Sequence, residues 1–217
     1  MSRLPRAATE DPLLPAGLAA ACVAFGLTFR GPRARFWQRM TATGLGLGSL
    51  ALASSPELRQ TRPRPRDAVT GVGSAAVLYG VFLVGDRMAR RIMPTGDDDI
   101  ADIYALRTLR PPGEIAARLA LVIGPAEELF WRGFVQPRMA RRLGRWPGAA
   151  AGSAAYGLAH VVTGNVTLVG AASVAGAFWS ALAAAGTPMS SLVASHIAWD
   201  IWTFLIAPTG PKAENAR

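Results

Sequence analysis

Between residues 119 and 136 the chain reads Leu119-Ala-Leu-Val-Ile-Gly-Pro-Ala-Glu127-Glu128-Leu-Phe-Trp-Arg132-Gly-Phe-Val-Gln136. Apolar residues flank two adjacent glutamates and an arginine on both sides. Each charge near the centre of a membrane helix costs roughly 2.5–3.5 kcal/mol, so ionisable residues at that depth are rare and mark functional sites. The stretch therefore predicts a membrane helix that carries a functional polar group.

The composition of the whole chain is typical of an integral membrane protein. Of its 217 residues, 51% are hydrophobic and only 17% are charged. Apolar runs near the roughly 20 residues that cross a bilayer recur along the chain. We predict a multi-pass protein of the cell membrane with an all-α fold, a polytopic transmembrane bundle of about six to eight membrane helices around an intramembrane polar cavity. The expected spans are residues 13–29, 40–55, 68–85, 117–139, 148–164, 166–186 and 190–208.

The formal charge of +9 does not indicate nucleic-acid binding, because of where the arginines lie. They gather between the expected spans, as basic residues in loops at membrane surfaces do. The lipid bilayer is therefore the expected partner, and no nucleic acid is expected. These residues are spread almost evenly over alternate loops, so they do not set the orientation in the membrane. The densest groups are Arg30, Arg33, Arg35 and Arg39; Arg59, Arg62, Arg64 and Arg66; and Arg138, Arg141, Arg142 and Arg145.

The sequence divides the chain into three parts. Residues 1–67 are expected to form an N-terminal membrane leader that ends in an alternating Pro/Arg linker, which favours an extended, solvated backbone. Residues 68–210 form the main membrane domain, and residues 211–217 form a C-terminal tail. Within the main domain, Gly148-Ala-Ala-Ala-Gly152 predicts close helix packing. An Ala-rich composition of the whole protein is the alternative explanation.

Three consecutive aspartates, Asp97 to Asp99, precede a segment from Ile100 to Arg110 with regularly spaced apolar residues. Acidic residues at the start and arginines at the end complement the dipole of a helix. The preferred interpretation is a capped helix at the membrane interface. A divalent-metal site at the aspartates is the alternative.

The helical spacing of the charged stretch gives its two glutamates different surroundings. Pro125 precedes them by two residues and predicts a kink or a local opening of the helix. Glu128 and Arg132 are four residues apart, about 40° around the helix axis, and can form an ion pair. Glu127 lies about 100° from Glu128 and points elsewhere. We predict that Arg132 holds Glu128 and that Glu127 is free to act. The alternative is a purely structural ion network.

Both histidines of the chain also lie in apolar segments. His160 follows Tyr156 by one turn, and His196 precedes Asp200 by one turn. A single histidine on an apolar helix is usually a satisfied core residue, but two on separate membrane helices beside a glutamate pair favour a shared site. A neutral histidine can share a proton with a carboxylate, which water activation requires.

Three motifs together resemble a known family. Glu127-Glu128-Leu-Phe-Trp-Arg132 resembles the EExxxR motif of the CPBP intramembrane proteases, also described as CAAX proteases or as bacteriocin-processing and Abi-type enzymes. Tyr156-Gly-Leu-Ala-His160 is similar to the FxxxH motif of that family, and His196-Ile-Ala-Trp-Asp200 to its HxxxN or HxxxD motif. The three occur in the order of the family, on three expected helices. The first third of the chain carries no part of the resemblance.

The resemblance implies an intramembrane endopeptidase, a hydrolase whose polar cavity lies within the bilayer. Its substrates would be membrane-associated peptides or proteins. By this resemblance Glu127 is the general base that activates a water for attack on a peptide carbonyl, with His160 as its partner. Glu128 and Arg132 would form the supporting ion pair, and Arg132 is also a candidate to contact a substrate carboxylate.

The resemblance further implies that His196 and Asp200 stabilise the tetrahedral oxyanion. Two departures from the family pattern bear on the site. Tyr156 replaces phenylalanine and adds a hydroxyl, and Asp200 stands where asparagine is often found. An ionised aspartate cannot donate to an oxyanion. Asp200 is therefore either protonated, or orients His196, or binds a metal.

A metal is the alternative to catalysis by glutamate alone. Glu127, His160 and His196 could supply a zinc-binding set, as in a metalloprotease, but the sequence has no HExxH motif. Metal-free catalysis is the preferred expectation. Two other functions stay open on the sequence: a proton-coupled transporter with an intramembrane Glu/His/Asp relay, and an inactive membrane scaffold of the same family. Transporters tend to carry internal repeats, and we find none.

Overall fold

The computed structural model describes residues 11–60, 62–92 and 95–209, and helices are the only regular secondary structure in them. The predicted all-α helical bundle is confirmed. Short 3₁₀ turns connect several of the helices. The α-helices are α1 (Leu13–Phe29), α2 (Phe36–Ser54), α3 (Pro65–Ile92), α4 (Gly96–Tyr104), α5 (Pro112–Arg118), α6 (Gly124–Glu128), α7 (Gln136–Leu143), α8 (Arg145–Ala159), α9 (Val166–Ala185) and α10 (Met189–Ile201).

Three π-helical turns interrupt or extend these helices, and each ends two residues before a proline. They are Leu119–Ile123, Leu129–Val135 and Trp202–Ile206, followed by Pro125, Pro137 and Pro208. Proline has no backbone N–H, and its ring crowds the carbonyl four residues earlier, so the regular hydrogen-bond ladder cannot continue through it. The helix instead forms wider π-helical turns, which hold about one residue more than an α-helical turn. The local opening expected at Pro125 is present, and a second one follows the glutamates.

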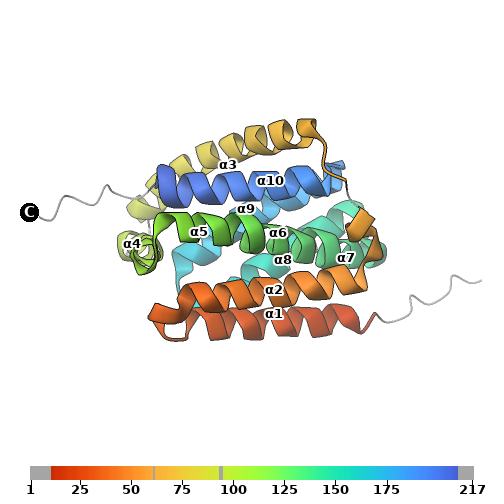
Figure 1. Ribbon diagram of the computed structural model, residues 1–217, viewed down its shortest axis with the longest axis horizontal. Helices are drawn as coiled ribbons and strands as arrows, with labels where there is room; N and C mark the ends of the chain where they lie inside the picture. The colour runs from red at the N-terminus through yellow and green to blue at the C-terminus, as the bar shows by residue number, and fades with distance from the viewer. Residues whose placement is uncertain (1–10, 61, 93–94, 210–217) are drawn as a thin grey trace, which may run out of the picture.

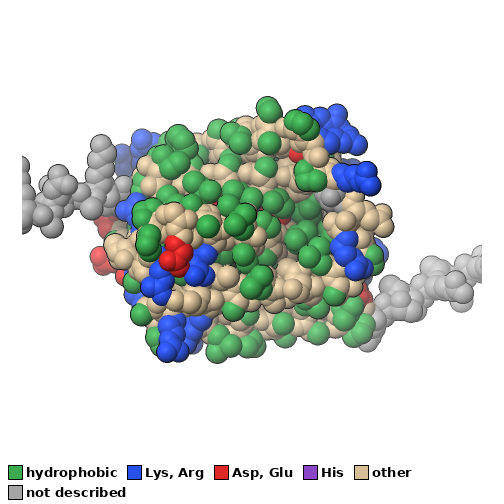
Figure 2. All heavy atoms as spheres, viewed as in Figure 1, with side chains coloured by type: hydrophobic (Ala, Val, Ile, Leu, Met, Phe, Trp, Pro, Cys, Tyr) green, Lys and Arg blue, Asp and Glu red, His purple; other side chains and the backbone are tan. Residues whose placement is uncertain are grey.

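The long helices lie along the long axis of the molecule, and the loops between them lie at its two ends (Figure 1). On the face seen in Figure 2, hydrophobic side chains cover much of the middle, while Lys and Arg side chains gather toward the ends. Many large apolar side chains are exposed on the molecule, among them Val72 and Val77 of α3. This distribution suits a protein whose middle lies in hydrocarbon and whose ends meet lipid headgroups.

Three helices of the described residues are long and apolar enough to cross a membrane. They are Pro65–Ile92, Val166–Ala185 and Met189–Ile206, and Leu13–Phe29 is a shorter apolar helix. The chain is a membrane protein on this evidence. Six to eight crossings, and a location in the cell membrane, stay predictions.

Small residues let neighbouring helices approach closely. α3 packs along α10, and α8 packs against both α7 and α9. A Cβ atom added at Gly71 of α3 would lie 2.6 Å from the Cβ of Ala194 in α10. A Cβ added at Gly148 would collide with the backbone of Ala140 in α7. Glycine at the start of the predicted GxxxG motif therefore serves helix packing, rather than reflecting composition alone.

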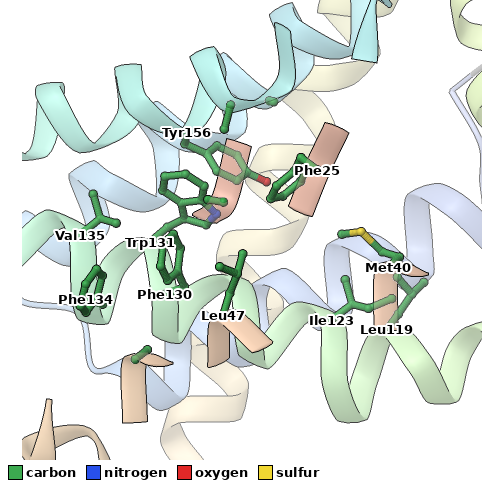
Figure 3. Packing of buried hydrophobic residues seen from close by; sticks show 14 of the residues in the cluster. Phe25, Met40, Leu47, Leu119, Ile123, Phe130, Trp131, Phe134, Val135 and Tyr156 are labelled. Atoms are coloured by element: carbon green, nitrogen blue, oxygen red, sulfur yellow. The ribbon is translucent and has the colours of Figure 1, made fainter. Parts of the chain in front are cut away.

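The N-terminal helices share a hydrophobic core with the helix that carries the charged stretch. Phe25 of α1 and Leu47 of α2 are buried in one cluster with Phe130 and Phe134 (Figure 3). These two helices are thus packed against the charged stretch, although the sequence motifs lie elsewhere in the chain.

The division into residues 1–67, 68–210 and 211–217 stays a prediction about domains. The tail 211–217 lies outside the described residues. The N-terminal part supplies one wall of the bundle, because α2 packs against the helical run from 119 to 135.

The linker prediction is wrong for its last three residues. The sequence predicts an extended segment through residue 67, whereas α3 begins at Pro65. Proline is tolerated in the first turn of a helix, where its missing N–H has no partner to lose. The buried carboxylate of Asp67 accepts hydrogen bonds from the Arg64 backbone N–H and from the Ser190 hydroxyl at the start of α10. Asp67 therefore fastens the start of α3 to the start of α10.

A helix is present at the three aspartates, but it includes them in its first turn, is shorter than expected, and has no side-chain hydrogen bond at its N-cap. α4 begins at Gly96 and ends at Tyr104, and a 3₁₀ segment follows to Leu109. The Asp99 carboxylate accepts hydrogen bonds from the backbone N–H and the hydroxyl of Thr167 in α9. Within the described residues these aspartates form no group that could hold a metal ion.

We expect Gly71→Ala to lower the free energy of unfolding by about 1–3 kcal/mol, the usual cost of overpacking. The added methyl group has no room between α3 and α10. Gly73→Ala is the control, because a Cβ there meets nothing within 4 Å. Thermal unfolding of both variants in one detergent measures the difference, and equal melting temperatures would contradict the packing described here.

Candidate active site

Glu127 and Glu128 lie at the middle of the helical run from Pro112 to Leu143. They end α6, which has a π-helical turn on each side. Such turns break the regular ladder and are frequent at functional sites. Both carboxylates are buried, with exposed fractions of 8% for Glu127 and 0% for Glu128. Two adjacent carboxylates therefore sit at mid-depth in a largely apolar bundle.

One oxygen of Glu128 accepts hydrogen bonds from two basic side chains. Arg132 Nη1 lies 3.0 Å from Glu128 Oε1, and His196 Nδ1 lies 2.7 Å from the same atom. Arg132 Nη2 donates to the carbonyl oxygen of Gly176 in α9 at 3.3 Å. A buried charge is tolerated when it is paired and hydrogen-bonded. The ion pair predicted between Glu128 and Arg132 is present, and His196 joins it.

His196 is held by a hydrogen bond at Nδ1 and by stacking on one ring face, and a carboxylate lies near its other nitrogen. Its Nε2 lies 3.7 Å from Asp200 Oδ2, and its ring stacks on the indole of Trp179, with centroids 4.0 Å apart and planes 16° apart. Trp179 is fixed in turn by a hydrogen bond from its Nε1 to Ser195 Oγ, at 3.0 Å. Asp200 thus lies near His196 but beyond hydrogen-bonding distance, and its role stays a prediction.

Glu127 has a partner that the sequence interpretation did not give it. The Tyr156 hydroxyl donates to Glu127 Oε2 at 2.7 Å. His160 Nδ1 donates to the Tyr156 carbonyl oxygen at 2.8 Å, and the two rings lie 4.7 Å apart. Because a carbonyl can only accept, the proton of neutral His160 is on Nδ1 and Nε2 is an acceptor. Tyr156 thus contacts both Glu127 and His160.

Arg132 connects the two halves of the site. Its guanidinium carbon lies 4.9 Å from the centroid of the Tyr156 ring and 5.4 Å from that of Trp179. Such contacts favour a desolvated cation. The structure thereby brings the predicted site residues into one continuous chain of contacts: Glu127, Glu128, Arg132, His160, His196 and Asp200.

The N-terminal helices complete the surroundings of Glu127. A small cavity of about 10 Å³ is lined by Glu127 and Ala126 together with residues of α1 and α2. Among these, Phe25 also packs on the His160 ring, with centroids 4.9 Å apart. Sequence reasoning missed this wall, as it missed Trp179, because apolar and aromatic residues in an apolar chain carry no sequence signal of a site. The N-terminal lining residues are Phe25, Met40, Thr43, Gly44 and Leu47.

The donor set does not suit a metal as the side chains are placed. Glu127, His160 and His196 were the candidate zinc ligands. In the described part of the chain, no three or more His, Cys, Asp or Glu side chains form a group that could hold a metal ion. The Nδ1 atoms of both histidines are engaged, one by Glu128 and the other by the Tyr156 carbonyl. We therefore derive no step through a metal.

Comparison with known proteins gives a family match for one segment of the chain. Residues 114–202 match the family model described as "Type II CAAX prenyl endopeptidase Rce1-like". The matched range contains all six candidate site residues, and α1, α2 and α3 lie outside it. The resemblance to the CPBP intramembrane proteases is confirmed. No curated protein and no solved structure gives a significant match to the chain.

We expect Arg132→Ala to destabilise the fold by about 3–5 kcal/mol, because it leaves the Glu128 carboxylate buried with one partner fewer. Arg33→Ala is the control, since Arg33 and Asp102 form an exposed pair at 3.6 Å that is worth at most about 1 kcal/mol. Folded yield and thermal unfolding in detergent compare the two. Equal stability of both variants would mean that the buried cluster does not hold the fold.

Proposed function

We propose that this chain, whose residues 114–202 match the Rce1-like family model, is an intramembrane endopeptidase. It cuts membrane-associated peptides or proteins with a water molecule activated by Glu127 and His160. The proposal rests on one observation: the two adjacent carboxylates have different hydrogen-bond partners. Glu128 is neutralised by Arg132 and His196, whereas Glu127 has only a neutral hydroxyl among the described residues. The family match supports peptide-bond hydrolysis as the class of reaction.

Glu127 acts as the general base. Its Oε2 is occupied by the Tyr156 hydroxyl, so Oε1 takes a proton from water while the water oxygen attacks the carbonyl carbon of the scissile bond. His160 Nε2 accepts a hydrogen bond from the same water and directs it. Glu127 then passes its proton to the amide nitrogen as the C–N bond breaks. The products are a carboxylic acid and an amine, and Glu127 is ionised again.

Glu128, Arg132 and His196 position the site and do not touch the reacting bond. Both terminal nitrogens of Arg132 are engaged, by Glu128 and by the Gly176 carbonyl. We therefore assign Arg132 to holding the cluster rather than to binding a substrate carboxylate. His196 donates a hydrogen bond from Nδ1 to Glu128, and the Asp200 carboxylate lies near Nε2 on the other side of the ring.

The substrate reaches the site from the lipid side. A groove of about 610 Å³ runs between α1 and α2, and its lining is almost entirely apolar. Thr43 and Leu47 line both this groove and the pocket at Glu127, so the two spaces adjoin. An apolar groove open to the bilayer suits a lipid-modified or hydrophobic peptide. CAAX-type prenylated C-termini fit this description, as do other membrane-anchored peptides.

We expect Glu127→Gln to abolish cleavage with little change in abundance, because the amide keeps the size of the side chain but cannot take a proton. Comparative membrane proteomics of cells with wild-type or variant protein should show uncut substrate accumulating. Glu114→Gln, in the same helical run and partly exposed, is the control. An unchanged proteome in the Glu127 variant would instead favour an inactive scaffold, and changed proton flux would favour a transporter.

Catalysis proceeds without a metal in this proposal, and Asp200 offers a test of it. Purified protein should contain no stoichiometric zinc and should stay active after exhaustive chelation. Asp200→Asn should keep activity or raise it modestly, because an asparagine amide can still hold His196 and can also donate to an oxyanion. Elemental analysis and activity of wild type and variant decide the matter. One zinc per chain, lost together with activity on chelation, would refute metal-free catalysis.

A further inference from the structure

The imidazole ring of His196 is held by a single hydrogen bond. Its Nδ1 donates to Glu128 Oε1 at 2.7 Å, whereas its Nε2 has no hydrogen-bond partner among the described residues and lies 3.7 Å from Asp200 Oδ2. A ring that is bonded through one nitrogen can still turn about that bond. Arg132 binds the same oxygen of Glu128, so a displaced His196 also changes the surroundings of this ion pair.

The indole of Trp179 supplies the second constraint on this ring. The indole and the imidazole of His196 are stacked, with centroids 4.0 Å apart and planes 16° apart, and both side chains are buried. The guanidinium carbon of Arg132 lies 5.4 Å from the centroid of the same indole. Trp179 of α9 therefore lies against both basic side chains that bind Glu128.

Two serines hold the indole in turn. Trp179 Nε1 donates to Ser195 Oγ at 3.0 Å, and Ser74 Oγ of α3 is hydrogen-bonded to the same oxygen at 2.9 Å. A serine hydroxyl both donates and accepts, so Ser195 can hold the indole and Ser74 at once. The absence of a side chain at Gly71 makes room for this contact, because a Cβ there would lie 2.9 Å from the backbone nitrogen of Ser195.

We propose that Trp179 is a positioning residue of the active site, and that Ser195 and Ser74 set its orientation. The inference rests on the proposed endopeptidase function and adds three residues that support it. With the indole in place, the ring of His196 keeps its Nδ1 directed at Glu128, and two donors share the Glu128 charge.

The consequence for the reaction follows from the neighbouring carboxylate. If His196 turns away, Glu128 keeps one donor in place of two, and a less neutralised charge then lies beside the general base Glu127. Two like charges close together disfavour the ionised form that a base needs. Ser74 lies outside the matched residues 114–202, so α3 becomes part of the support of the site.

Ser195→Ala removes the acceptor of the indole and changes the size of the side chain little. On a substrate identified by the proteomic comparison, kcat should fall about 10- to 100-fold with KM unchanged, because a misplacement near 1 Å can cost about 100-fold. Ser191→Ala is the matched control. It also removes a buried hydroxyl from α10, but one without a hydrogen-bond partner in the described residues, so it should keep the wild-type kcat.

Histidine NMR reports the ring itself, because the chain has only two histidines. In protein labelled with 2-¹³C-histidine, the Cε1 proton of His196 should be shifted upfield by the ring current of the stacked indole. Ser195→Ala should move this signal downfield, toward the position of a free histidine. The signal of His160, identified by its loss in His160→Gln, should stay in place, and Ser191→Ala should move neither.

The outcomes separate this inference from the proposed function. If Ser195→Ala leaves the His196 signal in place, or moves it while kcat stays at the wild-type value, the positioning role is wrong and the endopeptidase stands. If Glu127→Gln cuts normally, both fail.

A second variant tests the same hydrogen bond should Ser195→Ala not fold. 3-Benzothienylalanine at position 179 keeps the shape of the indole, with sulfur in place of the N–H group that Ser195 accepts. The same loss of kcat and the same shift of the His196 signal would support the inference. Full activity of that protein would overturn it.

Discussion

The shared oxygen of Glu128, bound by both Arg132 and His196, is the interaction on which the rest of the bundle depends. Each of these charges would be strongly unfavourable in a low-dielectric interior without its partners. The partners come from different helices, so α10 must place His196 beside α6, and α9 must bring the Gly176 carbonyl to Arg132. A Cβ at Gly176 would lie 2.8 Å from the Tyr156 ring. The buried charges therefore require the helices that supply their partners to pack closely.

The same arrangement gives two neighbouring carboxylates different chemistry. Residues adjacent in a helix point about 100° apart, so Glu128 faces α9 and α10 while Glu127 faces α8 and the N-terminal helices. Glu128 contacts cationic side chains, whereas Glu127 contacts a phenol. Different environments let two like groups take different roles within one site. Here the assignment follows from helix geometry, before any substrate is present.

Local spacing made part of this site predictable. The Glu128–Arg132 pair follows from the four-residue interval, and the opening near Pro125 follows from the missing N–H. The Tyr156–Glu127 bond and the stacking of Trp179 on His196 join residues from distant helices, so no local rule gives them. The all-α bundle followed from apolar runs, whereas the buried role of Asp67 depended on Ser190, far along the chain.

The segment that matches the family and the segment that surrounds Glu127 are not the same. Residues 114–202 contain the motif residues, but residues of α1 and α2 line most of the Glu127 pocket. Thr28 and Thr43 are hydrogen-bonded across these two helices at 2.9 Å, at the point where groove and pocket adjoin. A peptide bond entering from lipid must pass this polar contact in an otherwise apolar wall. In the proposed enzyme, the motif helices therefore supply the reacting groups. The unmatched N-terminal helices decide which substrates reach these groups.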